Sequence, residues 1–362
     1  MEIETKIPFY GKTALIFISI ISLVFTLYEG QQIIIPLLYA TIIAILLNPL
    51  MNFLIRKRIN KVVAISIAVA IASLMALGMF YVVSSQITMV TETYPQLRDK
   101  FSIISKEIVH WVSGKFKIRE SNITEWLSDT ENDAINKFAI GEKLTEAGRI
   151  LVTTMLLPVY IYLMLFYKHL LLDFIRKIFR SIHHIAVVEV LLNSKKIIQD
   201  YLVGLFFELI IIAVLNSVGL LLLNIDYAIF LGITGAILNI IPYFGGIIAI
   251  ALPMIIAFVT KDSYMSSVLV FVVYLFIQFI DNHLIIPHIV SSRVKINALV
   301  SVVAVLIGDA IWGIPGMFLS IPIVAVLKVI FDHIEPLKPY GFLLGNIVPT
   351  FHKFNLIKIK KL

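Results

Sequence analysis

Long apolar stretches alternate with short polar ones along most of the chain. A helix needs about 20 apolar residues to cross the hydrocarbon core of a bilayer. Six stretches meet this length, the first of them only with its flanks: residues 12–28, 33–55, 62–86, 149–167, 201–223 and 264–286. The pattern therefore predicts an all-α polytopic membrane protein with about six full transmembrane helices.

Two further apolar regions are interrupted at their centres. In the first, Pro-Tyr-Phe-Gly-Gly separates residues 227–241 from 247–260; in the second, Ile-Trp-Gly-Ile-Pro-Gly separates 297–310 from an arm ending near Ile330. An arm of about 15 residues rises only about 22 Å, which is less than a hydrocarbon core of about 30 Å. We therefore expect two re-entrant helical hairpins, for about eight transmembrane segments in total.

Basic residues gather in the loops that this topology places on one side. Residues 56–61 read Arg-Lys-Arg-Ile-Asn-Lys, and residues 168–200 and the tail 336–362 are also rich in Lys. Cytoplasmic loops of membrane proteins carry an excess of Lys and Arg. Both termini are therefore expected in the cytoplasm, and the net charge of +7 is interpreted in this way and not as a nucleic-acid surface.

Residues 87–147 differ from the rest of the chain in composition. They hold eight Lys and Arg against ten Asp and Glu, a net charge of −2. Apolar positions recur there at steps of three and four, which indicates a helical face. We interpret this segment as a small extracytoplasmic helical insert. The other predicted units are 1–86 (N-terminal transmembrane helices), 148–200 (a transmembrane helix and a cytoplasmic amphipathic helix), 201–335 (transport core) and 336–362 (basic cytoplasmic tail).

The predicted core contains a weak internal repeat. A span followed by a hairpin occurs at 201–260 and again at 264–330, and the two units enter from opposite sides, as inverted repeats do in many secondary transporters. Asn239 lies seven residues before Gly246, and Asp309 lies seven before Gly316. Both positions are then expected near the middle of the bilayer, where the opposed hairpins would enclose a small-molecule or cation site.

Overall composition agrees with this picture and argues against several other classes. Hydrophobic residues make up 59% of the chain and charged residues 15%, whereas a soluble domain has about 25% charged residues. Cysteine is absent, so disulfides and thiolate metal sites are excluded. The Gly-Lys-Thr at 11–13 lacks the earlier glycine of a phosphate-binding loop, since Lys6 stands there. With no hydrolase-type catalytic set either, we expect no enzyme activity, no metal and no cofactor.

Polar residues within the predicted spans are the candidates for a solute or ion site, because charge at membrane depth is costly and usually faces a cavity or an ion path. Asp281 and Asn282 are predicted to form a proton- or cation-binding pair; the alternative is a hydrated helix end or an ion pair with Arg293. Glu208 and Asp309 are further candidates, and for Asp309 the alternative is a buried, protonated, hydrogen-bonded carboxyl.

Two amides and a set of helix-breaking residues complete the candidates. Asn239 and Gln278 are predicted either to line the site or to serve as interhelical hydrogen-bond partners. Broken backbone at membrane depth is tolerated where it is buried in protein or lines a water-filled space, so the glycines and prolines of the hairpins are predicted hinges or gates. They are Pro242, Gly245, Gly246, Pro253, Gly313, Pro315, Gly316 and Pro322.

Three segments carry a resemblance to a known family: IPYFGGIIAIALP at 241–253, DNHLIIPHIVSSRVKIN at 281–297 and GIPGMFLSIP at 313–322. With them the chain resembles the autoinducer-2 exporter family of bacterial membrane proteins over nearly its whole length. The resemblance implies a secondary transporter of the bacterial inner membrane, and a homo-oligomer, in particular a pentamer. Family members export a small furanone signal or exchange sodium or lithium for protons, so the resemblance leaves the substrate open.

The family pattern places its motif residues at Pro242, Gly245, Pro253, Asp281, Asn282, Pro287, Gly313, Gly316 and Pro322. Two departures stand out: Gly246 occupies a position where proline is frequent, and Asp309 one where small or apolar residues are usual. The expected function is thus ion-coupled export of a small solute similar to autoinducer-2. A sodium or lithium/proton antiporter is the alternative, and a non-transporting scaffold or pore is an alternative of another class.

Overall fold

The computed structural model describes residues 8–82, 84–85, 155–179, 183–241, 245–261, 263–291 and 296–346. Within these ranges the regular structure is helical apart from one isolated β-bridge, between Ile296 and Gly345. Six of the helices found there are long and apolar enough to span a membrane. The predicted all-α polytopic fold is therefore confirmed, while the predicted insert at 87–147 lies outside the described residues.

The N-terminal helices follow the predicted spans. Helix α1 runs Phe9–Glu29 and α2 runs Gln31–Arg56; the next helix is Lys61–Val82, and the described part of the fourth span is Met155–Phe166. Its successor, α6 (Lys168–Ile178), is amphipathic and bends away from it by 64°. No residue of α1 is buried, and such a continuous apolar surface suits contact with lipid.

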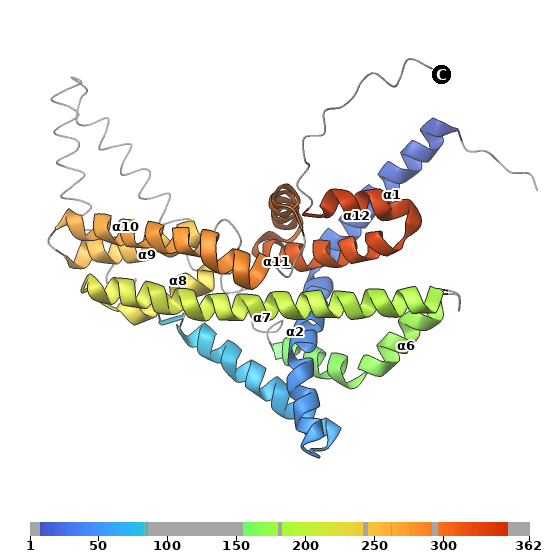
Figure 1. Cartoon of the computed structure of the whole chain (residues 1–362), viewed down its shortest axis with the longest axis horizontal. Helices are drawn as coiled ribbons and strands as arrows, with labels where there is room; N and C mark the ends of the chain where they lie inside the picture. The colour runs from blue at the N-terminus through green and yellow to red at the C-terminus, as the bar shows by residue number, and fades with distance from the viewer. Residues whose placement is uncertain are drawn as a thin grey trace, which may run out of the picture.

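One long helix forms the axis of the molecule (Figure 1). Helix α7 runs without a break from His184 to Leu222, about 58 Å by its rise per residue. It begins well before Tyr201, so residues 184–200 continue the predicted fifth span as one helix. Helices α2, α6, α8, α10 and α11 all pack against it.

The first interrupted region contains two short apolar helices, α8 (Ala228–Asn239) and α9 (Gly245–Thr260), which pack against each other as a helical hairpin. Gly245 lies directly against the Leu238 carbonyl, with no room for a Cβ atom. Helix α10 (Tyr264–Ile280) follows, and at its end the winding changes to a π-helix, Asp281–Ser291. Such segments are rare and often occur at functional sites.

The second interrupted region is helix α11, Ala298–His333, which breaks at Gly313 (φ 61°, ψ −145°). L-residues rarely adopt this conformation. In Figure 1 one arm of α11 is seen end-on and the other from the side. Side chains fasten the break to the N-terminal helices: Trp312 Nε1 donates to the Leu27 carbonyl at 2.9 Å, and the Tyr39 hydroxyl donates to the Pro315 carbonyl at 3.3 Å.

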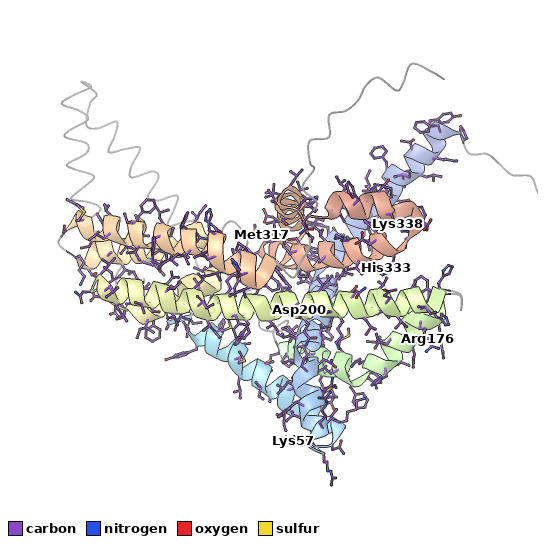
Figure 2. The ribbon with its side chains drawn as sticks, in the orientation of Figure 1. Lys57, Arg176, Asp200, Met317, His333 and Lys338 are labelled. Carbon is purple, nitrogen blue, oxygen red and sulfur yellow. The ribbon has the colours of Figure 1, made fainter. Side chains whose placement is uncertain are left out.

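The chain then makes a 3₁₀ turn, Glu335–Leu337, and the short helix α12, Lys338–Leu344. Figure 2 shows Arg176, His333 and Lys338 gathered where α6, the start of α7 and the end of α11 come together. The hairpin α8–α9 and helix α10 lie along the opposite half of α7 (Figure 1).

Candidate transport site

Asp281 occupies the point where α10 becomes a π-helix, and its side chain is 1% exposed. Asn239 Nδ2, at the end of α8, donates a hydrogen bond of 2.9 Å to Asp281 Oδ2. Gln278 Nε2 donates to the same oxygen at 3.5 Å. The second carboxylate oxygen, Oδ1, is buried with no hydrogen-bond partner in the described part of the chain. Half of this carboxylate is thus left without a donor.

Glu208, on α7, is the second buried carboxylate, with 7% of its surface exposed. Ile212, one turn after Glu208, belongs to the same buried group as Ile277 and Ile285, which stand four residues before and after Asp281. Across the described ranges, no Lys, Arg or His forms an ion pair with Glu208 or Asp281. We refer to Glu208, Asn239, Gln278 and Asp281 as the carboxylate cluster.

Apolar packing surrounds this cluster. Ile212, Ala236, Ile277 and Ile285, from α7, α8, α10 and the π-helix, form one buried hydrophobic group. Charge in such surroundings is poorly solvated. The cluster therefore combines two acidic groups, two amides and an environment that disfavours a net charge.

A second polar layer lies farther along the same helices. Gly235 of α8 lies against Asn216 of α7 and Tyr274 of α10: a Cβ atom added to Gly235 would be 3.2 Å from Asn216 Nδ2 and 3.4 Å from the Tyr274 hydroxyl. Both side chains are buried, and neither Asn216 Oδ1 nor the Tyr274 hydroxyl has a hydrogen-bond partner among the residues described. We refer to Asn216 and Tyr274 as the amide–phenol pair.

On α7 and again on α10, helical spacing places the residues of the two layers on one face of the helix. Glu208 and Asn216 are eight residues apart on α7, and Tyr274, Gln278 and Asp281 follow at steps of four and three. Residues three, four or seven to eight apart share a helix face, and eight residues rise about 12 Å. Tyr274 was missed as a candidate, although its spacing from Gln278 and Asp281 was a usable signal.

The structure separates the other predicted site residues from this cluster. Asn282 points outward and is exposed, although it directly follows Asp281. Asp309 is also exposed, on the first arm of α11, an element that contributes no residue to the cluster. The predicted pair Asp281–Asn282 is therefore replaced by Asp281–Asn239, which joins the π-helix to the hairpin.

Some of the predicted hinge residues lie at helix breaks, and others lie within helices. Gly246 borders the cluster, since a Cβ atom there would lie 2.5 Å from Gln278 Oε1 and 3.3 Å from Asn239 Oδ1. Gly316 is in close backbone contact with Gly308 across the α11 break. Pro253 and Pro322 are buried within α9 and α11. Pro242 lies outside the described residues.

Known proteins are similar to this chain over most of its length, including the helices of the candidate site. The model of the AI-2E family transporter matches residues 15–335. YueF of Bacillus subtilis, provisionally named a transport protein, is 22% identical over 346 residues, or 92% of this chain and 89% of YueF. The AI-2 transport protein TqsA of Escherichia coli is 22% identical over 334 residues, or 88% of this chain and 91% of TqsA. YrrI of Bacillus subtilis is 34% identical over 135 residues, 37% of each chain.

Proposed function

Because the chain belongs to the AI-2E transporter family, we propose that it is a secondary transporter of the bacterial inner membrane that exports a small polar solute in exchange for protons or metal cations. The observation that supports this most directly is the carboxylate cluster. Two carboxylates, Glu208 and Asp281, are buried together without a cationic side chain among the described residues. A site built only to stabilise the fold would gain from a partner at this position.

The energetic cost of burying Glu208 and Asp281 without a cationic partner favours the binding of an exchangeable cation. Two unpaired carboxylates in an apolar bundle carry a desolvation cost of several kcal/mol each, and their mutual repulsion adds to it. The cost is removed when a proton or a metal cation joins the cluster. Asp281 Oδ1, which has no donor in the described structure, is the atom that we assign to this cation. Occupancy of the cluster then depends on the ion concentrations on the two sides of the membrane.

The hairpin connects this occupancy to a change of shape. Asn239 is the last residue of α8, where the helix ends before resuming at Gly245 in α9. A displacement of the hairpin therefore changes the Asn239–Asp281 hydrogen bond, and loading of Asp281 changes the energy of that displacement. Discontinuous helices that meet at a buried ion site are the arrangement on which alternating access is based in many secondary transporters.

The amide–phenol pair is our candidate for contact with the solute. Its unpaired acceptor and hydroxyl suit a small molecule bearing hydroxyl groups, which fits the name of the relative TqsA, an AI-2 transport protein. Antiport of sodium or lithium against protons is the second candidate function, and the carboxylate cluster alone supports it. The two candidates differ in whether a solute other than the ion moves.

Flux in sealed proteoliposomes tests the proposal. Vesicles loaded with a pH-sensitive dye receive a sodium or lithium gradient, and wild type is compared with Asp281→Asn and with Asp309→Asn, a matched acidic control that is exposed. We expect gradient-dependent proton movement in wild type and Asp309→Asn and its loss in Asp281→Asn. Equal movement in all three would remove the coupling role from Asp281. Absence of proton movement with either cation would count against antiport, and the same vesicles would then receive a gradient of a hydroxylated furanone.

A further inference from the structure

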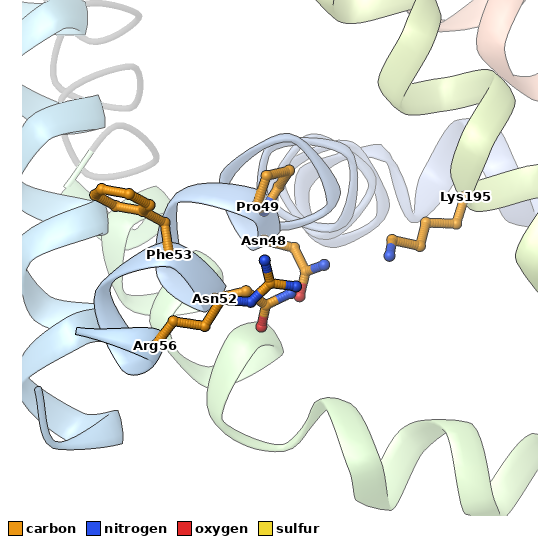
Figure 3. Close-up of a pocket in the computed structure, with 6 residues that line it drawn as sticks. All are labelled: Asn48, Pro49, Asn52, Phe53, Arg56 and Lys195. Carbon is orange, nitrogen blue, oxygen red and sulfur yellow. The ribbon is translucent and has the colours of Figure 1, made fainter. Parts of the chain in front are cut away.

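A second polar site lies away from the carboxylate cluster, between the C-terminal end of α2 and the first half of α7. A cavity of about 280 Å³ opens there, lined by Asn48, Pro49, Asn52, Phe53, Arg56 and Lys195. Figure 3 shows Lys195 reaching from α7 toward the α2 side chains, with the Arg56 guanidinium beside Asn52. The polar lining consists of two cations and two amides, and none of the lining residues is acidic.

No acidic side chain of the described residues pairs with the cations that line this cavity. Neither Arg56 nor Lys195 forms an ion pair within the described ranges. Lys168, at the start of α6, adds a third cation behind the wall, where its Nζ donates to Asn48 Oδ1 at 2.8 Å. Burial together with the charges of Lys195 and Lys61 lowers the pKa of Lys168. Several cations therefore act on one small volume.

The Asn48 amide of the lining is oriented by its contact with Lys168. Asn48 is only 3% exposed, and its oxygen is occupied by Lys168. Its Nδ2 group has no acceptor in the part of the chain that the structure describes, so it remains available as a donor. A guanidinium, an ammonium and an amide N–H that converge on one cavity are donors suited to an oxyanion, and to phosphate in particular.

From this convergence we propose that the cavity between α2 and α7 binds a phosphate group, supplied by the headgroup of an acidic phospholipid or by a free phosphate anion. Its volume lies just below the roughly 300–1,000 Å³ typical of sites for whole small molecules, so it suits a single charged group. Phe53, 56% exposed, and Pro49 give the rim an apolar edge, which is where the glycerol and acyl part of a lipid would continue. Basic pockets between transmembrane helices are known to hold anionic lipid headgroups.

A phosphate in this position would join elements that are otherwise far apart in the chain. Arg56 ends α2, Lys195 belongs to α7, and Lys168 begins α6. An anion shared by Arg56 and Lys195 would fasten α2 to the axial helix, and the Lys168–Asn48 hydrogen bond connects α6 to the same site. The proposal is independent of the transport reaction, because none of these residues belongs to the carboxylate cluster.

Ligand-dependent thermal unfolding of the full-length protein in detergent tests this site. Unfolding midpoints from circular dichroism would be recorded against rising concentrations of short-chain phosphatidylglycerol, short-chain phosphatidylcholine and inorganic phosphate. The variants are Lys195→Gln and Arg56→Gln, with Lys196→Gln as the control: it removes the same charge from the next residue, which is exposed and does not line the cavity. We expect each cavity variant to weaken apparent affinity about tenfold, as the loss of one charge-assisted hydrogen bond predicts.

Stabilisation by phosphatidylglycerol but not phosphatidylcholine, reduced in Lys195→Gln or Arg56→Gln and kept in Lys196→Gln, supports the site with a lipid as its source. The same variant pattern with inorganic phosphate supports the site with a free anion as its source. An equal reduction in Lys196→Gln would show only diffuse attraction to negative charge and would overturn the proposal. So would the absence of stabilisation by either phosphate compound. If one cavity variant fails to fold, the other decides.

Discussion

Among the described residues, the hydrogen bond between Asn239 and Asp281 ties the α8–α9 hairpin to the π-helix through the carboxylate, and its strength can be measured. We consider Asn239→Ala and Asp281→Ala, singly and together. Interhelical hydrogen bonds in membrane proteins average about 0.6 kcal/mol and reach about 1.7 kcal/mol, whereas bonds to a charged group contribute about 1.5–3 kcal/mol. The bond is 2.9 Å long, and the carboxylate is 1% exposed and has one other donor within the described residues, Gln278 at 3.5 Å. We therefore expect a coupling energy of about 1–2 kcal/mol.

The assay is reversible unfolding in mixed micelles, followed by circular dichroism, for wild type, the two single variants and the double variant. A parallel cycle that pairs Asn282→Ala with Asp281→Ala is the control, because Asn282 is adjacent in sequence but exposed. A coupling energy for Asn239 below about 0.3 kcal/mol, the level at which independent sites add, would refute the view that this bond holds the hairpin. An equal coupling for Asn282 would refute its specificity.

Two further predictions concern the buried acid and the broken helix. Glu208→Gln removes one unpaired carboxylate and should raise the unfolding free energy by about 1 kcal/mol while abolishing ion-coupled flux. Its control is Glu189→Gln, at an exposed position of the same helix, which should change neither quantity. A loss of stability in Glu208→Gln would contradict our account of the cluster. Gly313→Ala should lower the unfolding free energy by about 1–2 kcal/mol, because alanine is strained at φ 61°. Gly78→Ala is its control, since Gly78 lies within a helix with open space around it. An equal change in unfolding free energy for the two variants would argue against strain at the break.

Much of the fold was predictable because lipid imposes simple rules on sequence. Apolar runs of sufficient length gave α1, α2 and the helix Lys61–Val82, and glycine and proline marked the break before Gly245 and the one at Gly313. The predicted fifth span begins at Tyr201, where composition changes from mixed to apolar, whereas helix α7 already begins at His184. A change in hydrophobicity does not by itself end a helix. Because no glycine or proline occurs between His184 and Tyr201, the helix continues through these residues.

The residues of the candidate site could be predicted from the sequence, but the hydrogen bonds between them could not. Asp281, Asn239, Gln278 and Glu208 were all candidates on the ground of their depth, but depth does not reveal which way a side chain points. Successive residues differ by about 100° around a helix. Gly308 therefore packs against Gly316 while Asp309, the next residue, is exposed, and Asn282 turns away from the cluster that Asp281 joins. Only tertiary packing, in which α8 lies against α7 and α9, selects Asn239 as the partner.

The contrast between the continuous and the interrupted helices indicates which parts are able to move. Helix α7 carries both Lys195 of the phosphate cavity and Glu208 of the carboxylate cluster, 13 residues or about 20 Å apart along one unbroken rod. The interruptions are found instead where α8 gives way to α9, where α10 becomes the π-helix, and at Gly313. Trp312 and Tyr39 tie the last of these to α1 and α2, whereas the side-chain hydrogen bonds at the first two, within the described residues, are those of Asn239 and Gln278 to Asp281. Because that junction is polar and its carboxylate is half satisfied, its energy depends on whether a cation is present. Loading of the carboxylate cluster is therefore expected to displace the α8–α9 hairpin against a fixed α7, and not to bend α7 itself.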